Sequence, residues 1–139
     1  MAATFHLSIL TPEHSFFDGT VEMLVLTTPD GEVGIQGGHQ PMVISTVEGE
    51  LRIQQGGKWR WAAASAGFVT VTQDEVLVML QTAEWPEEID VKRAQRAEQD
   101  AREKLRQQRS LEEFHIARAT LGRAMARLRV SGKRNINNN

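Results

Sequence analysis

The spacing of apolar residues changes abruptly at Pro86, and this change constrains the fold more than any other feature of the sequence. Before Pro86, apolar and polar side chains alternate, as they do from Phe5 to Ile9, and after it the apolar residues recur at three- and four-residue steps. Alternation is typical of a half-buried β-strand, and the longer step of an amphipathic helix. We therefore expect a strand-built module over residues 1–86 and a helical module over residues 87–139.

Short alternating runs fill the first module and are separated by turn signals rich in Gly, Pro and Asp. In one of these runs Val21, Met23 and Val25 are expected to share a strand face. The pair Gly56-Gly57, which stands between two runs, is typical of a tight β-hairpin. Strands at this spacing predict an antiparallel sandwich or flattened barrel.

The second module predicts two helices. Residues 89–108 contain no Gly or Pro, Asp90 can cap their start, and one face carries Val91, Ala94, Ala97, Ala101 and Leu105. The second helix opens at Ser110 with a capping box, in which the serine hydroxyl and the Glu113 carboxylate each bond the other residue's amide. Its apolar stripe consists of Phe114, Ala117, Leu121, Ala124 and Leu128. The short connection predicts an antiparallel hairpin, and residues 135–139 a frayed tail.

The composition of the two stripes predicts weak packing. Alanine dominates both, so at about 25 cal/mol per Å² the seam yields only a few kcal/mol before ordering costs are subtracted. Gly122 costs the second helix about 1 kcal/mol relative to alanine. A weakly packed hairpin of this kind is compatible with an element that moves relative to the first module, and equally with a dimerisation element.

Charge and composition exclude several classes of protein. Residues 1–86 hold three basic and ten acidic side chains, and the remainder thirteen basic and eight acidic, which indicates two modules with different surroundings. The absence of cysteine excludes disulfides and thiolate chemistry, and the four histidines lack metal-ligand spacing, so no metal site is expected. The first residues lack the features of a signal peptide, and no apolar run reaches the about 20 residues of a spanning helix, so no membrane insertion is expected.

The segment GEVGIQGGHQPM, residues 31–42, concentrates four glycines in twelve positions. It lacks the lysine and the strand-to-helix context of a phosphate loop. Glycines that let a strand bend, followed by an exposed His-Gln-Pro corner at His39 to Pro41, explain it better. His39 alone is more typical of a corner residue than of a catalyst.

No set of residues predicts an active site, because Ser45 and Ser65 lack the context of an activated nucleophile, and the chain is expected not to be an enzyme. The basic residues of the second helix and its end are Arg118, Arg123, Arg127, Arg129, Lys133 and Arg134. They suit a solvated face, a nucleic-acid contact, or docking on an acidic protein surface or a nucleotide. The acidic first module and the pI near 6.1 argue against nucleic acid. The three tryptophans at 59, 61 and 85 are expected to pack in the core or between the modules.

The segments FHLSILTPEHSFFDGTVEMLVLTTPDGEVGIQGGHQPM, SAGFVTV, IDVKRA and RAMARLRV resemble the epsilon subunits of F-type ATP synthases, called delta in mitochondria. The resemblance covers essentially the whole chain. It implies an α+β fold, a flattened antiparallel β-sandwich of about ten strands followed by a two-helix hairpin. It also implies a non-catalytic subunit of the central stalk that couples rotation to ATP synthesis in a proton-translocating enzyme. The implied place is peripheral, on the cytoplasmic face of a bacterial cell membrane.

The resemblance also implies partners and the residues that meet them. Glu32 falls where the family contacts the rotor ring of c subunits, and His39 and Pro41 lie on the side associated with the gamma subunit. The hairpin of the family can lie compactly or extend into the catalytic head of alpha and beta subunits and block ATP hydrolysis. The basic residues that would then meet the head are Arg118, Arg123 and Arg127.

The resemblance implies a regulatory ligand as well, although no cofactor is required. Some members bind ATP in the compact state through an I/L-D-x-x-R-A motif and arginines of the last helix. The matching residues in this chain are Ile89, Asp90, Arg93, Ala94, Arg123 and Arg127. Guanidinium groups suit phosphate and a carboxylate can accept from adenine or ribose, although Asp90 serves equally well as a helix cap. Arg118 departs from the spacing of the family's binders.

Two other hypotheses stay open at this stage. The chain can be a free-standing β-sandwich that binds a ligand or protein, with the hairpin as an oligomerisation element. It can also bind nucleic acid through its basic end, which salt-sensitive binding to DNA or RNA would reveal. Co-purification with a gamma-like subunit and suppression of ATPase activity separate the first hypothesis from the stalk subunit.

Overall fold

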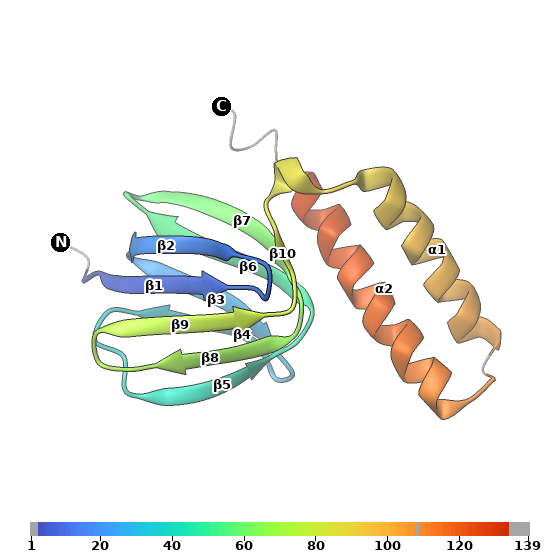
Figure 1. Ribbon diagram of the computed structural model, residues 1–139, viewed down its shortest axis with the longest axis horizontal. Helices are drawn as coiled ribbons and strands as arrows, with labels where there is room; N and C mark the ends of the chain where they lie inside the picture. Colours follow the sequence, from blue (N-terminus) through green and yellow to red (C-terminus); the bar gives the residue numbers. More distant parts are fainter. Residues whose placement is uncertain (1–2, 108, 134–139) are drawn as a thin grey trace.

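The computed structural model describes residues 3–107 and 109–133 and consists of a β-sandwich with a helical hairpin at one end (Figure 1). The strands are β1 Phe5–Leu10, β2 Ser15–Val21, β3 Met23–Thr28, β4 Gly31–Gln36, β5 Met42–Thr46, β6 Gly49–Gln55, β7 Lys58–Ala64, β8 Gly67–Val71, β9 Glu75–Leu80 and β10 Ala83–Glu84. The first sheet has the order β2-β1-β9-β8-β5, and the second the order β10-β7-β6-β3-β4. The predicted sandwich of about ten strands is confirmed.

One pair of strands departs from the prediction of an antiparallel sandwich. The β1 and β9 strands run parallel at the centre of the first sheet, with Leu7 opposite Val76 and Ile9 opposite Val78, and all other pairs within the described residues are antiparallel. A parallel pair needs a long crossover, and here the crossover consists of the seven strands β2 to β8. The first sheet is therefore mixed.

The core between the sheets comes from the alternating positions that the sequence predicts. The side chains of Leu7 and Ile9 from β1, Leu51 and Ile53 from β6, and Val76, Val78 and Leu80 from β9 are buried there. Gly56 and Gly57 close the β6–β7 hairpin with φ angles of 59° and 77°. Both angles lie in the left-handed region that a tight hairpin turn requires, so the predicted turn is confirmed.

The run from Val21 to Val25 was predicted wrongly as one strand with one buried face. Val21 ends β2 in the first sheet, and β3 begins at Met23 in the second, so the chain changes sheets at Glu22. In β3 the core residues are Leu24 and Leu26. The alternation continues across a change of sheet, and the pattern alone therefore conceals the break.

The helical module consists of a short 3-10 turn, η1 Pro86–Glu88, followed by α1 Val91–Gln107 and α2 Leu111–Ser131. The Asp90 carboxylate accepts a bond of 3.1 Å from the Arg93 amide, and the Ser110 hydroxyl one of 3.0 Å from the Glu113 amide. Both predicted helix starts are confirmed, although within the described residues the capping box lacks its return bond from the Glu113 side chain. The predicted frayed tail, residues 135–139, and Arg134 lie outside the described residues.

The second helix is buried on two sides, because it lies between α1 and strands β6 and β7 (Figure 1). Ala117 and Ala124, from the predicted stripe, are buried on it. Ala126 and Val130 are buried as well, and Val130 packs against Ala63 of β7. The predicted stripe therefore omits a second buried side of α2, which joins the hairpin to the sandwich.

Candidate functional site

The helical hairpin is joined to the sandwich by a row of ion pairs. Arg123 of α2 pairs with Glu48 at 3.4 Å, Arg129 pairs with Glu50 at 2.9 Å, and Arg127 pairs with Glu84. The glutamates come from the acidic first module and the arginines from the basic second helix. The opposite charges of the two modules therefore pair with each other inside the molecule. This pairing was not predicted from the sequence.

The apolar part of the same interface is small. Ala63, Ile89 and Val130 are buried together, with Trp61 and Val91 packed beside them. Partly exposed ion pairs contribute about 0.2–1 kcal/mol each, so the three pairs add roughly 1–3 kcal/mol to this limited apolar contact. The structure thus fits the sequence-based expectation of a weakly held hairpin.

A cleft of about 570 Å³ opens between the hairpin and one end of the sandwich. Asp90, Arg93 and Ala94 of the sequence motif line it together with Arg123 and Arg127 of α2. The structure therefore brings together five of the six residues expected at a nucleotide site. The sixth, Ile89, is buried beneath the hairpin in the cluster with Ala63 and Val130.

Other cleft residues were not expected from the sequence. Glu13 and His14, from the turn between β1 and β2, and Glu84 and Glu88, from the segment before α1, also line the cleft. The Glu88 carboxylate accepts a bond of 2.9 Å from the Trp85 amide, which orders the start of the helical module. These residues come close to the motif only through the tertiary fold, and no local pattern marks them.

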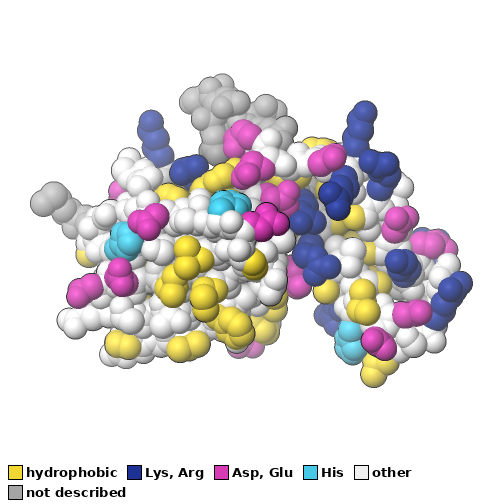
Figure 2. Space-filling model, in the orientation of Figure 1, with side chains coloured by type: hydrophobic (Ala, Val, Ile, Leu, Met, Phe, Trp, Pro, Cys, Tyr) yellow, Lys and Arg dark blue, Asp and Glu magenta, His cyan; other side chains and the backbone are white. Residues whose placement is uncertain are grey.

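Arg118 lies apart from the other two arginines of the predicted head contact. It lines a hollow near the tip of the hairpin with Phe114 and Leu121 of α2 and Leu105 of α1. Arg123 and Arg127 lie instead against the sandwich. The three arginines are thus divided between the free tip and the docked face, and Figure 2 shows that Lys and Arg gather on the hairpin side of the molecule.

The glycine-rich segment forms β4 and the corner after it. Glu32 lies near the start of β4, and its carboxylate pairs with Arg52 of β6 at 3.2 Å. Gly38, with a φ of 81°, turns the chain after β4, and the half-buried His39 and exposed Pro41 lead into β5. The expected ring contact and the expected gamma contact therefore lie at opposite ends of one edge strand.

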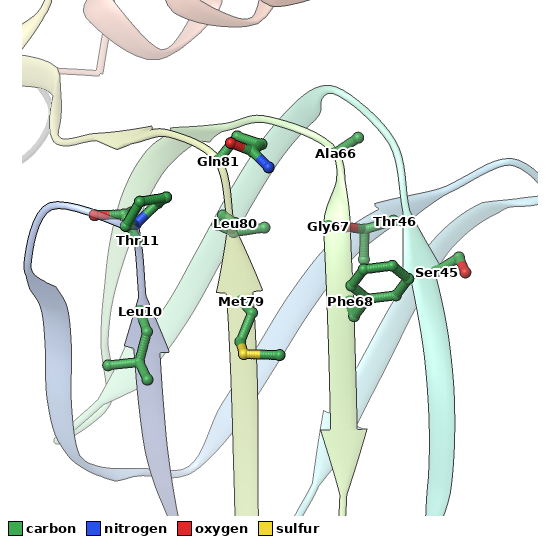
Figure 3. Close-up of a pocket in the computed structure, with 11 residues that line it drawn as sticks. Leu10, Thr11, Ser45, Thr46, Ala66, Gly67, Phe68, Met79, Leu80 and Gln81 are labelled. Atoms are coloured by element: carbon green, nitrogen blue, oxygen red, sulfur yellow. The ribbon is translucent and has the colours of Figure 1, made fainter.

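An exposed apolar face on the first sheet was missed by the sequence analysis. It consists of Leu10, Val43, Phe68 and Met79, whose exposed fractions run from 37% to 73%. Leu10 and Phe68 each lie directly opposite Met79 on neighbouring strands, so these side chains form a continuous row (Figure 3). Figure 2 shows hydrophobic side chains gathered on this side of the sandwich. Contiguous exposed apolar patches of this kind indicate a binding surface.

A cleft of about 720 Å³ accompanies the apolar face (Figure 3). Thr46 lines this cleft, is only 6% exposed, and its hydroxyl has no hydrogen-bond partner within the described residues. An unpaired buried hydroxyl costs about 1–3 kcal/mol. The hydroxyl oxygen is itself buried, so a partner docked on the exposed face does not reach it, and the apolar row is what this cleft offers to a partner.

A cluster of one histidine and two carboxylates, His6 with Asp18 and Glu75, lies on the same sheet. The His6 ring bonds Asp18 of β2 at 2.7 Å and Glu75 of β9 at 3.2 Å, and so links three strands. The hydrogen bond that the Asp18 carboxylate accepts from the ring raises the pKa of His6 above its ordinary 6.5, against a smaller opposing effect of desolvation, and Glu75 adds to the rise.

Replacement of this histidine by glutamine, His6→Gln, is expected to reduce stability more at pH 5.5 than at pH 8.5. A raised pKa in the folded state means that the charged ring stabilises the fold fully below pH 6.5 and that this contribution is lost as pH rises through the folded pKa. Urea unfolding of both proteins at the two pH values measures the difference. An equal difference at both would show that the cluster contributes no pH-dependent stability.

Comparison with known proteins identifies related sequences along nearly the whole chain. Residues 4–86 match the family model described as the beta-sandwich domain of the ATP synthase delta/epsilon chain, and residues 87–132 the model of its long alpha-helix domain. An ATP synthase epsilon chain of Caldanaerobacter subterraneus is 44% identical over 134 residues, which is 96% of this chain and 97% of the relative. One of Caldicellulosiruptor saccharolyticus is 46% identical over 132 residues, which is 95% and 96% of the two chains.

Solved structures share the fold. A chain in a cryo-EM structure of the Euglena gracilis mitochondrial ATP synthase superposes with a TM-score of 0.79 at 24% identity, covering 91% of this chain and 80% of that one. A chain of the Tetrahymena thermophila mitochondrial ATP synthase, in a structure of its central stalk and c-ring, gives 0.65 at 18% identity, covering 93% and 94%. Neither helix within the described residues is long and apolar enough to cross a membrane.

Proposed function

The chain belongs to the delta/epsilon family of ATP synthase subunits, and we propose that it is a non-catalytic epsilon subunit of the rotor's central stalk. In this role the sandwich binds the gamma subunit and the ring of c subunits, and transmits rotation between them. The hairpin regulates ATP hydrolysis through the alpha and beta subunits of the catalytic head. The protein works on the cytoplasmic face of a bacterial cell membrane as a peripheral subunit of a proton-translocating enzyme.

The apolar face is the observation that carries this function. Its row of Leu10, Met79 and Phe68 offers a continuous apolar surface beside the cleft that Phe68 and Met79 also line. The gamma subunit is its proposed occupant, and His39 and Pro41 lead into β5, the edge strand that carries Val43 of the same face. Glu32, at the other end of β4, is the proposed contact to the ring.

Substitution of a central residue of this face, Phe68→Asp, is expected to weaken gamma binding about 30-fold or more, because a buried aromatic anchor contributes about 2 kcal/mol or more to an interface. The stability of the isolated chain should change little, since Phe68 is 57% exposed. Ile116→Asp is the matched control, because Ile116 is 60% exposed on the hairpin. Co-purification with a gamma subunit and titration of the complex measure the effect. Binding equal to that of the control would instead favour a free-standing binding module.

The motif cleft is the proposed site of ATP as a regulatory ligand. Arg93, Arg123 and Arg127 bring three guanidinium groups to it, and their planar donors suit the phosphates. The Asp90 carboxylate is available to the nucleoside end as an acceptor, while it also caps α1. Because the cleft walls come from both modules, a nucleotide bound there stabilises the docked hairpin.

Removal of two of these guanidinium groups, Arg93→Ala with Arg123→Ala, is expected to weaken ATP binding about 30-fold or more and to abolish the ATP-dependent rise in melting temperature. Glu48→Gln is the matched control, because it breaks the Arg123 ion pair and leaves both arginines in place. Arg118→Ala removes an arginine outside the cleft. Calorimetric titration with ATP measures all four proteins. Equal affinity in the double variant and the wild type would remove ATP from the proposal.

A further inference from the structure

A chain of side-chain contacts runs across the outer side of the second sheet, from the end of α2 to the edge strand β4. The Lys133 ammonium lies 4.3 Å from the ring centre of Trp61, and the Arg52 guanidinium lies 5.1 Å from the same ring. The Arg52 guanidinium also pairs with Glu32 at 3.2 Å. No step of this chain is part of the cleft or of the apolar face described above.

The position of Lys133 depends on the docked hairpin. Lys133 follows α2 directly, and its amide bonds the Val130 carbonyl at 2.9 Å. Val130 is fully buried against Ala63, beside Trp61. When α2 leaves the sandwich, Val130 and Lys133 leave Trp61 together, so the contact between Lys133 and Trp61 exists only in the docked state.

The charge balance at Trp61 depends on Glu32. The two cations lie 5.1 Å and 4.3 Å from the centre of one ring and therefore within about 10 Å of each other. The Debye length is about 8 Å at physiological salt, but a partly buried charge such as that of Arg52 is screened less than an exposed one, so a weak repulsion acts between the two cations. The Arg52 side chain is only 27% exposed, and the Glu32 carboxylate is its one counter-charge within the described residues. Without that carboxylate, the positive charge of Arg52 acts on Lys133 with less compensation.

We propose that the occupancy of Glu32 and the docking of the hairpin are coupled through Arg52, Trp61 and Lys133. A cationic partner group that takes Glu32 away from Arg52 weakens the attachment of α2. By thermodynamic reciprocity, the docked hairpin weakens the binding of that group by the same factor. The coupling extends the proposed function and rests on it only in taking Glu32 as a partner contact, because the contacts that link Glu32 to Lys133 all lie within this chain.

The test removes the carboxylate charge in the full-length chain, with Glu32→Gln in place of the partner. Hydrogen exchange of the α2 amides over residues 123–131 reports how often the hairpin detaches. We expect Glu32→Gln to speed this exchange about two- to fivefold, the size of effect that partly exposed charge pairs produce. Asp30→Asn is the matched control, because it removes the same charge from the neighbouring turn, where the Asp30 side chain forms no ion pair among the described residues.

A second background shows whether the effect passes through Lys133. In Lys133→Met, which keeps an apolar side chain on Trp61 without the charge, Glu32→Gln should leave the exchange unchanged. If α2 amides exchange equally fast in Glu32→Gln and in Asp30→Asn, the coupling is overturned. It is also overturned if Glu32→Gln speeds the exchange by the same factor in the Lys133→Met background. Loss of ring binding is measured separately on the assembled enzyme, so failure of the ring contact and failure of the coupling give different results.

Discussion

Deletion of residues 88–139 is expected to abolish inhibition of ATP hydrolysis while the remaining sandwich still binds the gamma subunit. The core of the sandwich is formed by residues that precede the deletion, and Trp85 keeps its stacked contact with Phe16 at 4.3 Å between ring centres. The apolar face lies on the first sheet, away from the α2 interface with β6 and β7. The hydrolysis rate of the assembled enzyme should therefore rise to that of an enzyme lacking the subunit.

A full-length control separates the presence of the hairpin from its docking. Replacement of Glu48, Glu50 and Glu84 by glutamine removes the three carboxylates that hold α2 and leaves both helices intact. This triple variant should inhibit hydrolysis more strongly than the wild type, because the docked state loses roughly 1–3 kcal/mol. If the variant that lacks residues 88–139 still inhibits ATP hydrolysis, the sandwich and not the hairpin carries the inhibition.

The sequence predicts the elements of the fold better than the way they meet. Alternation locates the inward side chains of β1, β6 and β9, because a buried strand face needs an apolar residue at every second position. It conceals the change of sheet at Glu22, since the same alternation runs through Val21 and Val25 on either side. The parallel pairing of β1 with β9 is also absent from any local pattern, because it joins residues about 70 positions apart.

The candidate site was also predicted from the sequence only in part. The motif at Asp90, Arg93 and Ala94 is visible in the sequence because all three lie within one helical turn. The acids that meet α2 could not be assigned, since an exposed strand glutamate and a glutamate that pairs with Arg127 look alike in sequence. The apolar face was missed for a related reason. Leu10, Phe68 and Met79 come from three strands, and only strand order and register bring them together.

The same dependence on register makes Gly67 the position where one added methyl group is expected to do most damage. Gly67 begins β8, opposite Leu80 of β9 and next to Thr46 of β5. A Cβ at this position would overlap the Met79 carbonyl oxygen and lie 2.9 Å from the Leu80 side chain. A backbone oxygen in a central strand cannot move without shifting the strand.

Gly67→Ala is therefore expected to lower the free energy of unfolding by about 3 kcal/mol or more. Gly122→Ala is the matched control, because its Cβ would meet Glu48 at an ordinary 3.5 Å, and the better helix propensity of alanine should stabilise the protein by about 1 kcal/mol. Urea unfolding of the two variants compares the same chemical change at a tight site and an open one. The shift of β8 against β9 also separates Phe68 from Met79, so Gly67→Ala should lose gamma binding even where it remains folded. A variant with wild-type stability and wild-type gamma binding would contradict the prediction, because it would show that β8 and β9 accommodate the added Cβ without shifting.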